Sequence, residues 1–179
     1  VEAMCLCSAR PSYTGKYLLR PACNAGHWHI VNLIGAGGES LNWYHRVFCQ
    51  DMDRDTFFRK FLPEALKGGD TGVAMTPYLA GDRTCVSNKA AAITGLTLST
   101  RREDILLALL KGLIKPLADG MDDFAGISTL SDTIFYTGGG AQALLDLKKK
   151  TFRQFRFVPV ADCAMTGIAK LTKIGMDSH

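Results

Sequence analysis

Long apolar runs, secretory signals and internal repeats are all missing from this 179-residue sequence. A membrane-spanning helix needs roughly 18 consecutive apolar residues, and no run approaches that length. A secretory signal would pair a basic segment with an apolar one at the start of the chain, and the first residues show no such pair. We therefore expect a soluble, cytoplasmic protein with no membrane partner.

Paired cysteine motifs are lacking as well. The six cysteines lie at positions 5, 7, 23, 49, 85 and 163, in apolar sequence and without a CxxC pair. Buried free thiols are a better interpretation than disulfides. Cys5 and Cys7 could form half of a metal site, but no second half with matching histidines or cysteines follows. We predict no metal bound by these side chains.

The sequence has only a small net charge. The 21 Lys and Arg side chains exceed the 17 Asp and Glu side chains by four, and they are scattered apart from clusters at 147–150 and 153–156. A nucleic-acid site would need a basic stripe that recurs elsewhere, so we interpret these clusters as a solvated face. At 179 residues and 47% hydrophobic content, the chain can bury one sizeable core.

The first half of the sequence changes its apolar period along the chain. Alternating residues predict extended segments, and apolar residues three or four apart predict helices. We expect extended segments at 1–7, 17–20, 27–35 and 73–76, and helices at 39–48 and 54–66. Asp53 is a plausible N-cap for the second helix. Because the chain begins inside a strand, we expect these residues to be part of a longer polypeptide.

The second half contains the longest periodic element, a helix predicted over 101–119. Thr100 is its candidate cap, and Pro116 is expected to bend or end it. Strands and helices then alternate: strand 133–136, helix 141–152, strand 155–158 and helix 161–173. This alternation favours a layered α/β domain.

Glycines mark two turns where a strand gives way to a helix. Gly138, Gly139 and Gly140 form one turn, and Gly37 and Gly38 form the other. Such glycines let backbone N–H groups approach a ligand, and the helix N-terminus adds partial positive charge. A nucleotide suits this arrangement, although two ordinary tight turns would give the same pattern. Neither GxGxxG nor GxxxxGK[ST] occurs, so neither a dinucleotide fold nor a P-loop is indicated.

Four segments in order carry a resemblance to a known family: GAGGESLNW, TPYLAGDRT, AITGLTLSTRREDILLALLKGL and YTGGGAQALL. The series resembles the C-terminal domain of the FGGY carbohydrate kinases, which have the actin-like ATPase fold. The third segment is the most specific. Its family pattern is satisfied by these residues: Ala91, Ile93, Gly95, Leu96, Asp104, Ile105 and Ala108.

The resemblance implies a fold and a function for residues 1–179. The fold is an actin-like (ribonuclease H-like) α/β domain, a mixed sheet flanked by helices, here expected to lack its first strands and to be incomplete at its N-terminal side. The function is the ATP-binding half of a sugar kinase, with ATP and Mg²⁺ as cofactors, which transfers the γ-phosphoryl group to a sugar or polyol hydroxyl.

The resemblance also implies site residues. In the family the GGGA loop borders the adenosine, and the other glycine turn with its helix lies along the nucleotide. The family's Gly-Thr-Ser phosphate motif would fall at Cys7, Ser8 and Ala9, where Ser8 keeps a hydroxyl. The implied nucleotide-binding residues are Ser8, Gly38, Ser40, Asn42, Gly138, Gly139, Gly140 and Ala141.

No catalytic residue is predicted within this chain. The family's catalytic aspartate belongs to a Gly-x-x-Asp-Gln segment that precedes the phosphate motif, and the sugar is held mostly by an N-terminal domain. Asp82, Asp104 and Asp162 are better explained as loop, cap and turn residues. We therefore expect the chain alone to be inactive. Its exposed first strand could pair with another copy, which would give a homodimer.

Two other interpretations stay open. Cys7, Lys111 and Leu144 depart from the family pattern, as they would in a degenerate, non-catalytic actin-like module that serves oligomerisation or regulation. An actin-like filament ATPase would share the glycine loop, but it would not explain PYLAGDRT followed by the Gly95 pattern. The sugar itself is not specified by these residues.

Overall fold

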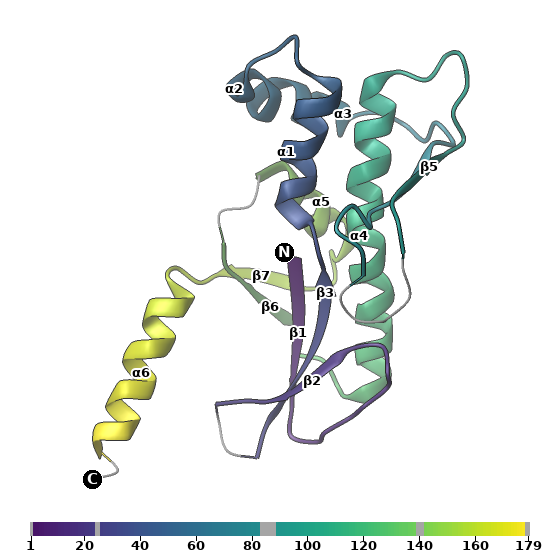
Figure 1. The fold of residues 1–179 in the computed structure, drawn as a ribbon. Coiled ribbons are helices and arrows are strands. Elements are labelled where there is room, and N and C mark those ends of the chain that lie inside the picture. Colours follow the sequence, from purple (N-terminus) through teal and green to yellow (C-terminus); the bar gives the residue numbers. More distant parts are fainter. Residues whose placement is uncertain (1, 24–25, 83–88, 139–141, 178–179) are drawn as a thin grey trace.

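A computed structural model describes residues 2–23, 26–82, 89–138 and 142–177 of the chain (Figure 1). Strands β1 (Glu2–Ser8), β3 (Trp28–Ile34) and β2 (Leu18–Pro21) form an antiparallel sheet in the order β1-β3-β2. Burial alternates along β1, as the sequence predicts for a strand with one covered face. The predicted extended segments in this region are confirmed.

Two further pairs of strands complete the β-structure of the described residues. Strand β4 (Ala74–Thr76) pairs antiparallel with β5 (Ala92–Thr94), and β6 (Thr133–Tyr136) pairs parallel with β7 (Arg156–Pro159). Strand β5 was not predicted, because its three residues are too few to show an alternating pattern. The expected mixed α/β architecture is confirmed, with its sheet in three separate parts.

The helices follow the predicted order. They are α1 (Gly37–Phe48), α2 (Arg54–Thr56), the π-helical turn η1 (Phe57–Phe61), α3 (Leu62–Ala65), α4 (Arg102–Ile127), α5 (Gln142–Thr151) and α6 (Cys163–Asp177). The predicted N-cap at Asp53 is confirmed, since its carboxylate accepts a hydrogen bond from the Thr56 N–H at 2.9 Å. Among the described residues, no helix is both long and apolar enough to cross a bilayer.

Helix α4 corrects two predictions. Its N-cap is Arg101 rather than Thr100, and the Asp104 carboxylate accepts the Arg101 N–H at 2.8 Å. It also continues past Pro116 to Ile127. An interior proline costs a helix about 3 kcal/mol, and burial of Leu117 and Phe124 beyond it offsets that cost. The side-chain amide of Asn32 donates to the Pro116 carbonyl at 2.8 Å and fixes this region to β3.

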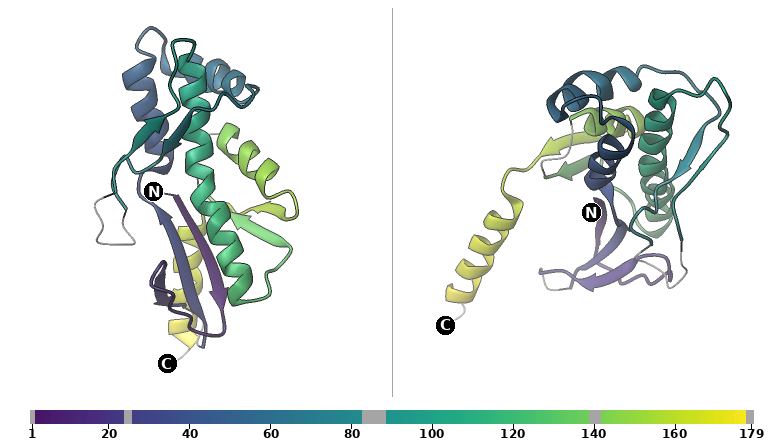
Figure 2. Two further views of the ribbon diagram at one scale, coloured as in Figure 1. Left: turned by 90° about the vertical axis from the view of Figure 1, so that its right-hand side faces the viewer. Right: turned by 45° about the horizontal axis from the view of Figure 1, so that its top comes forward.

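The core gathers around α4, which runs beside the β1-β3-β2 sheet and alongside α1 (Figure 1). Helix α6 differs, since Figure 1 and the right-hand view of Figure 2 show it standing apart from the rest of the domain. The prediction of buried thiols is wrong for Cys5, Cys7 and Cys23, which are exposed, and right for Cys49. Cys5 and Cys7 lie on the outer face of β1, which the other described elements do not cover. Cys85 lies outside the described residues.

Candidate functional site

The turn from β3 into α1 contains glycines with different reasons to be glycine. A Cβ added to Gly37 would lie 2.7 Å from the Glu2 Cβ, and one added to Gly35 would lie 3.4 Å from the Gly81 carbonyl oxygen. Gly37 therefore lets α1 begin directly against β1, which an alanine could not do without a shift. A Cβ at Gly35 would make only ordinary van der Waals contact with the loop at Gly81, so packing does not require a glycine there.

Gly38 has no such reason within the domain. No heavy atom lies within 4 Å of a Cβ added to it, and its φ is outside the left-handed region. It lies in the first turn of α1, whose N-cap Ala36 makes no side-chain capping bond. The first N–H groups of a helix have no intrahelical acceptor, so this turn presents donors beside open space. That arrangement suits an anionic ligand.

Ser40 and Asn42 use their polar groups within α1. The Ser40 side chain is fully buried, and its hydroxyl donates to the Ala36 carbonyl oxygen. The Asn42 amide donates to the Glu39 carboxylate at 2.8 Å and is half-buried. Ser40 thus supports the turn from inside, while Asn42 lies on the helix surface one turn beyond Gly38.

The second glycine turn follows β6. Gly138 has a φ of +110°, a conformation that only glycine adopts readily, and no heavy atom lies within 4 Å of an added Cβ. The remaining predicted residues of this loop, Gly139, Gly140 and Ala141, lie outside the described residues. Helix α5 begins directly after them at Gln142.

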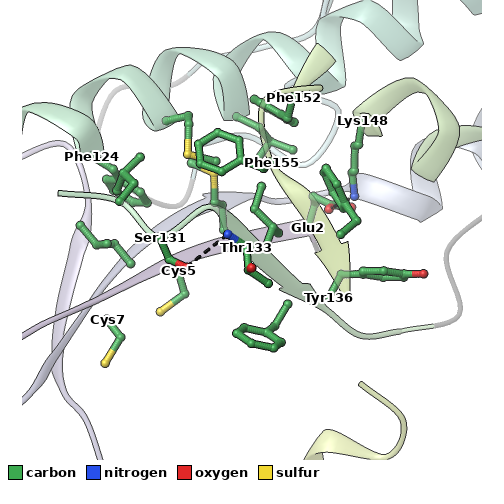
Figure 3. A pocket seen from close by; sticks show the side chains of 18 of the residues that line it. Glu2, Cys5, Cys7, Phe124, Ser131, Thr133, Tyr136, Lys148, Phe152 and Phe155 are labelled. Carbon is green, nitrogen blue, oxygen red and sulfur yellow. Dashed lines mark hydrogen bonds and ion pairs between the residues drawn. The ribbon is translucent and has the colours of Figure 1, made fainter. Parts of the chain in front are cut away.

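An ion pair connects α5 to β1. Glu2, which lies against Gly37, pairs with Lys148 of α5, and both side chains are about four-fifths buried (Figure 3). Partial burial protects such a pair from solvent screening. The helix after the Gly138 turn is thereby tied to the strand that packs on the Gly37 turn. No local sequence pattern predicts this contact, because its partners are 146 residues apart.

Ser8 is not brought to these turns. Strand β1 runs antiparallel to β3, so Glu2 pairs with Ile34 next to α1, whereas Ser8 pairs with Trp28 at the other end. Six residues of strand span about 20 Å, which separates Ser8 from Gly37. Its hydroxyl accepts a hydrogen bond from the Arg10 N–H at 3.1 Å, and the side chain is buried. Ser8 therefore lies at the opposite end of β1 from the Gly37 turn.

The carboxylates expected to be structural occupy structural positions. Asp104 caps α4, Asp162 has a φ of +46° in the turn before α6, and Asp82 pairs with Lys89 at 2.6 Å. Within the described ranges, no group of three or more His, Cys, Asp or Glu side chains could hold a metal ion.

The fold and both glycine turns can be compared with known proteins. The model of the FGGY family of carbohydrate kinases, C-terminal domain, matches residues 7–148. This chain belongs to that family. The match runs from the last two residues of β1 through most of α5, so it includes the turns at Gly38 and Gly138. The resemblance seen in the four sequence segments is confirmed.

Relatives of this FGGY domain are sugar kinases. Xylulose kinase of Bacillus subtilis is 28% identical over 117 residues, which cover 64% of this chain and 23% of the relative. Gluconokinase of Bacillus licheniformis is 29% identical over 104 residues, covering 52% and 20% respectively. The aligned part of the FGGY domain therefore spans less than a quarter of the length of these relatives.

A solved structure shows the same fold. The crystal structure of xylulose kinase from Rhodospirillum rubrum matches with a TM-score of 0.75 at 18% identity. The match covers 90% of this chain and 33% of that one. The expected actin-like architecture of the FGGY domain is thereby confirmed, and the domain corresponds to one third of the solved chain.

Proposed function

We propose that this chain, residues 1–179, is the ATP-binding half of a sugar kinase that transfers the γ-phosphoryl group of ATP to a sugar or polyol hydroxyl. The observation that carries the proposal is Gly38, a glycine beside open space at an uncapped helix N-terminus. A packing or conformational requirement explains Gly37 and Gly138, but neither explains Gly38. Close approach of a ligand to the backbone does.

The residues present fit a nucleotide. The N–H groups in the first turn of α1 would donate to phosphate oxygens, and the absence of a side chain at Gly38 would allow that approach. The Gly138 loop would border the adenosine. Asn42, one turn further along α1, would lie beside the nucleotide, and Ser40 would hold the turn from inside. Bound ATP would supply the phosphoryl group and bring Mg²⁺ on its phosphates.

The remaining chemistry is assigned to the rest of the kinase. Phosphoryl transfer to a hydroxyl needs a group that accepts the proton of that hydroxyl. The carboxylates considered above serve the fold in capping, turn and ion-pair positions. We propose that the sugar-binding site and the catalytic base belong to the part of the kinase that this chain does not span, so the chain alone has no turnover. The relatives' names favour a pentose or sugar acid as substrate class.

The departures from the family pattern have roles in the fold. Lys111 lies 3.8 Å from Asp70 across an exposed ion pair, and Leu144 is 4% exposed within the core. These substitutions therefore do not by themselves require a degenerate module. That alternative predicts a folded chain that binds no nucleotide.

Calorimetric titration with MgATP tests the proposal. We expect saturable binding by the wild-type chain and at least tenfold weaker binding by Gly38→Leu, which fills the open space without an internal clash. Gly126→Leu is the matched control, because it places the same side chain at another open helical glycine, near the end of α4. Unchanged binding in folded Gly38→Leu would contradict the site, and sugar-dependent ATP turnover by the wild-type chain would contradict the division of chemistry.

A further inference from the structure

A polar cavity of about 390 Å³ lies between the end of β3, the middle of α4 and the loop that follows β4. Elements far apart in the sequence line it: Asn32 comes from β3, Tyr78 from the loop and Asp119 from α4. Ligand cavities commonly have volumes of about 300–1,000 Å³, so this one has room for a small molecule. Gly38 and Gly138 are not among the described residues that line it.

Charged side chains of both signs line the cavity, and each carboxylate among them has a cation beside it. The three pairs, with N–O distances of 2.6, 3.1 and 3.0 Å, are Asp82–Lys89, Asp123–Lys16 and Asp119–Lys115. A ligand with a net charge would have to compete with these pairs, and it would leave one of their charges without its partner. The cavity therefore suits an uncharged ligand.

The ion pairs leave hydrogen-bonding capacity toward the cavity. An ammonium group has three N–H donors, and a carboxylate has about four acceptor sites. The side chains of Lys16 and Asp119 are 67% and 60% exposed, so each can form a further hydrogen bond. The Asp82 side chain is only 7% exposed, which holds its carboxylate in place at the cavity wall. A ligand that both donates and accepts hydrogen bonds is required.

Two tyrosines give the cavity apolar surface as well. The Tyr17 ring packs edge-on against Phe124 with ring centres 5.2 Å apart, and the Tyr78 ring centre lies 4.9 Å from the Lys89 ammonium. A tyrosine presents an apolar ring together with a polar hydroxyl. A carbon chain that bears several hydroxyl groups matches both features, because its C–H groups pack on rings and its hydroxyls donate and accept hydrogen bonds.

We propose that this cavity binds an uncharged polyhydroxyl compound, a free sugar or polyol, at a site separate from the phosphoryl transfer. The proposed function assigns the sugar-binding site of the reaction to the part of the kinase that this chain does not span. A polyol bound by residues 1–179 alone would therefore occupy a second site. This inference does not depend on nucleotide binding, because neither glycine turn belongs to the cavity.

Titration with xylitol, an uncharged five-carbon polyol, tests the proposal in the full chain without nucleotide. Backbone amide NMR signals report where the ligand binds. We expect saturable shifts at Gly15, Lys16 and Leu33, which line the cavity, and no shift at Gly38. Gluconate carries a carboxylate and should bind more weakly than xylitol. Equal binding of the two compounds would overturn the assignment of an uncharged ligand.

A pair of variants in α4 tests the cavity wall. Asp119→Ala removes a charged acceptor and should weaken xylitol binding about tenfold, the effect of losing one charged hydrogen bond. Asp122→Ala is the matched control, because Asp122 is an exposed carboxylate of the same helix and is not among the residues that line the cavity. It should bind xylitol like wild type. Circular dichroism checks that both variants are folded.

Three results would overturn the proposal. They are an absence of saturable shifts in the folded wild-type chain, equal weakening by Asp119→Ala and Asp122→Ala, and shifts that appear at the Gly38 turn and not at the cavity. The outcome is separate from that of the nucleotide titration. A chain that binds xylitol at the cavity but does not bind MgATP would contradict the proposed function alone, and the reverse result would contradict the polyol site alone.

Discussion

Helices α4 and α6 have the same apolar spacing and opposite burial. In α4, Leu106, Leu109 and Leu113 recur every three or four residues and are at most 2% exposed. In α6, Met165 and Ile168 are spaced in the same way and are 69% and 60% exposed. The period identifies a face that needs a partner. It does not say whether that partner belongs to the same chain.

The contrast extends to the rest of the domain. Elements packed on α4, including α1, α3 and β4, form one core. Outside that core, Phe135 of β6 and Leu171 of α6 are exposed apolar residues. A chain that spans one third of a related structure would leave such surfaces on the side of its missing contacts.

Truncation of one leucine in each helix should give the largest difference. Leu109→Ala creates a cavity in the core and should lower the free energy of unfolding by about 2–5 kcal/mol. Leu171→Ala removes an exposed side chain from α6 and should change it by no more than about 0.5 kcal/mol. Urea denaturation measures both. Equal losses would mean that α6 is packed as tightly as α4.

Two glycines within α4 provide a second contrast. A Cβ at Gly112 would lie 2.2 Å from the Met75 carbonyl oxygen, so Gly112→Ala forces α4 away from β4. We expect a loss of about 1–3 kcal/mol, the usual cost of overpacking. No heavy atom lies within 4 Å of a Cβ at Gly126, and Gly126→Ala should add about 0.5–1 kcal/mol through helix propensity. Urea denaturation curves should therefore shift in opposite directions, and a shared direction would contradict the contact with β4.

The sequence predicted these helices better than their ends. The apolar stripe of α4 was evident, but its passage through Pro116 depends on Asn32, 84 residues away, and on burial that no local pattern reveals. Strand β5 was missed because three residues carry too little period. Helix α6 was predicted correctly over most of its length, while its separation from the core could not be read from its own residues.

The candidate site was likewise predicted only in part from the sequence. Glycine turns after strands predicted Gly38 and Gly138 as places for a ligand, and the structure leaves open space at both. The packing role of Gly37 depends on Glu2, and the distance of Ser8 depends on the register of β1 against β3. Both are properties of strand pairing, which the order of motifs along the sequence does not contain.

A smaller loss of stability is expected in the first turn of α4, within the part of the domain that packs into the core. Asp104 accepts the Arg101 N–H, and Asp104→Ala removes that acceptor, so we expect a loss of about 1 kcal/mol. Asp104→Asn keeps a carbonyl oxygen at the same place and should lose less. Thermal denaturation of the three proteins checks the order. Equal losses in both variants would show that the charge, and not the capping bond, stabilises this turn.

The smallest effect is expected where β2 and its preceding loop meet the end of α4. The Tyr17 hydroxyl donates to Asp123 at 2.5 Å, and Lys16 lies 3.1 Å from the same carboxylate oxygen. These two hydrogen bonds, that of Tyr17 first, hold the pKa of Asp123 below its usual range. Burial, followed by the Asp123 carboxylate, raises the pKa of Tyr17, so the phenol stays a donor at neutral pH.

Because the pKa of Asp123 is lower in the folded state, its contribution is present above about pH 4, the ordinary value for Asp, and is lost as the pH falls further. Tyr17→Phe removes the main cause and keeps the edge contact with Phe124, whose ring centre is 5.2 Å away. We expect the variant to melt below wild type at pH 6, with the gap closing toward pH 2. Tyr13→Phe, at a tyrosine that is 78% exposed, should melt like wild type throughout. A gap that stays constant with pH would assign the effect of Tyr17 to packing and leave Asp123 without a role in joining this loop to α4.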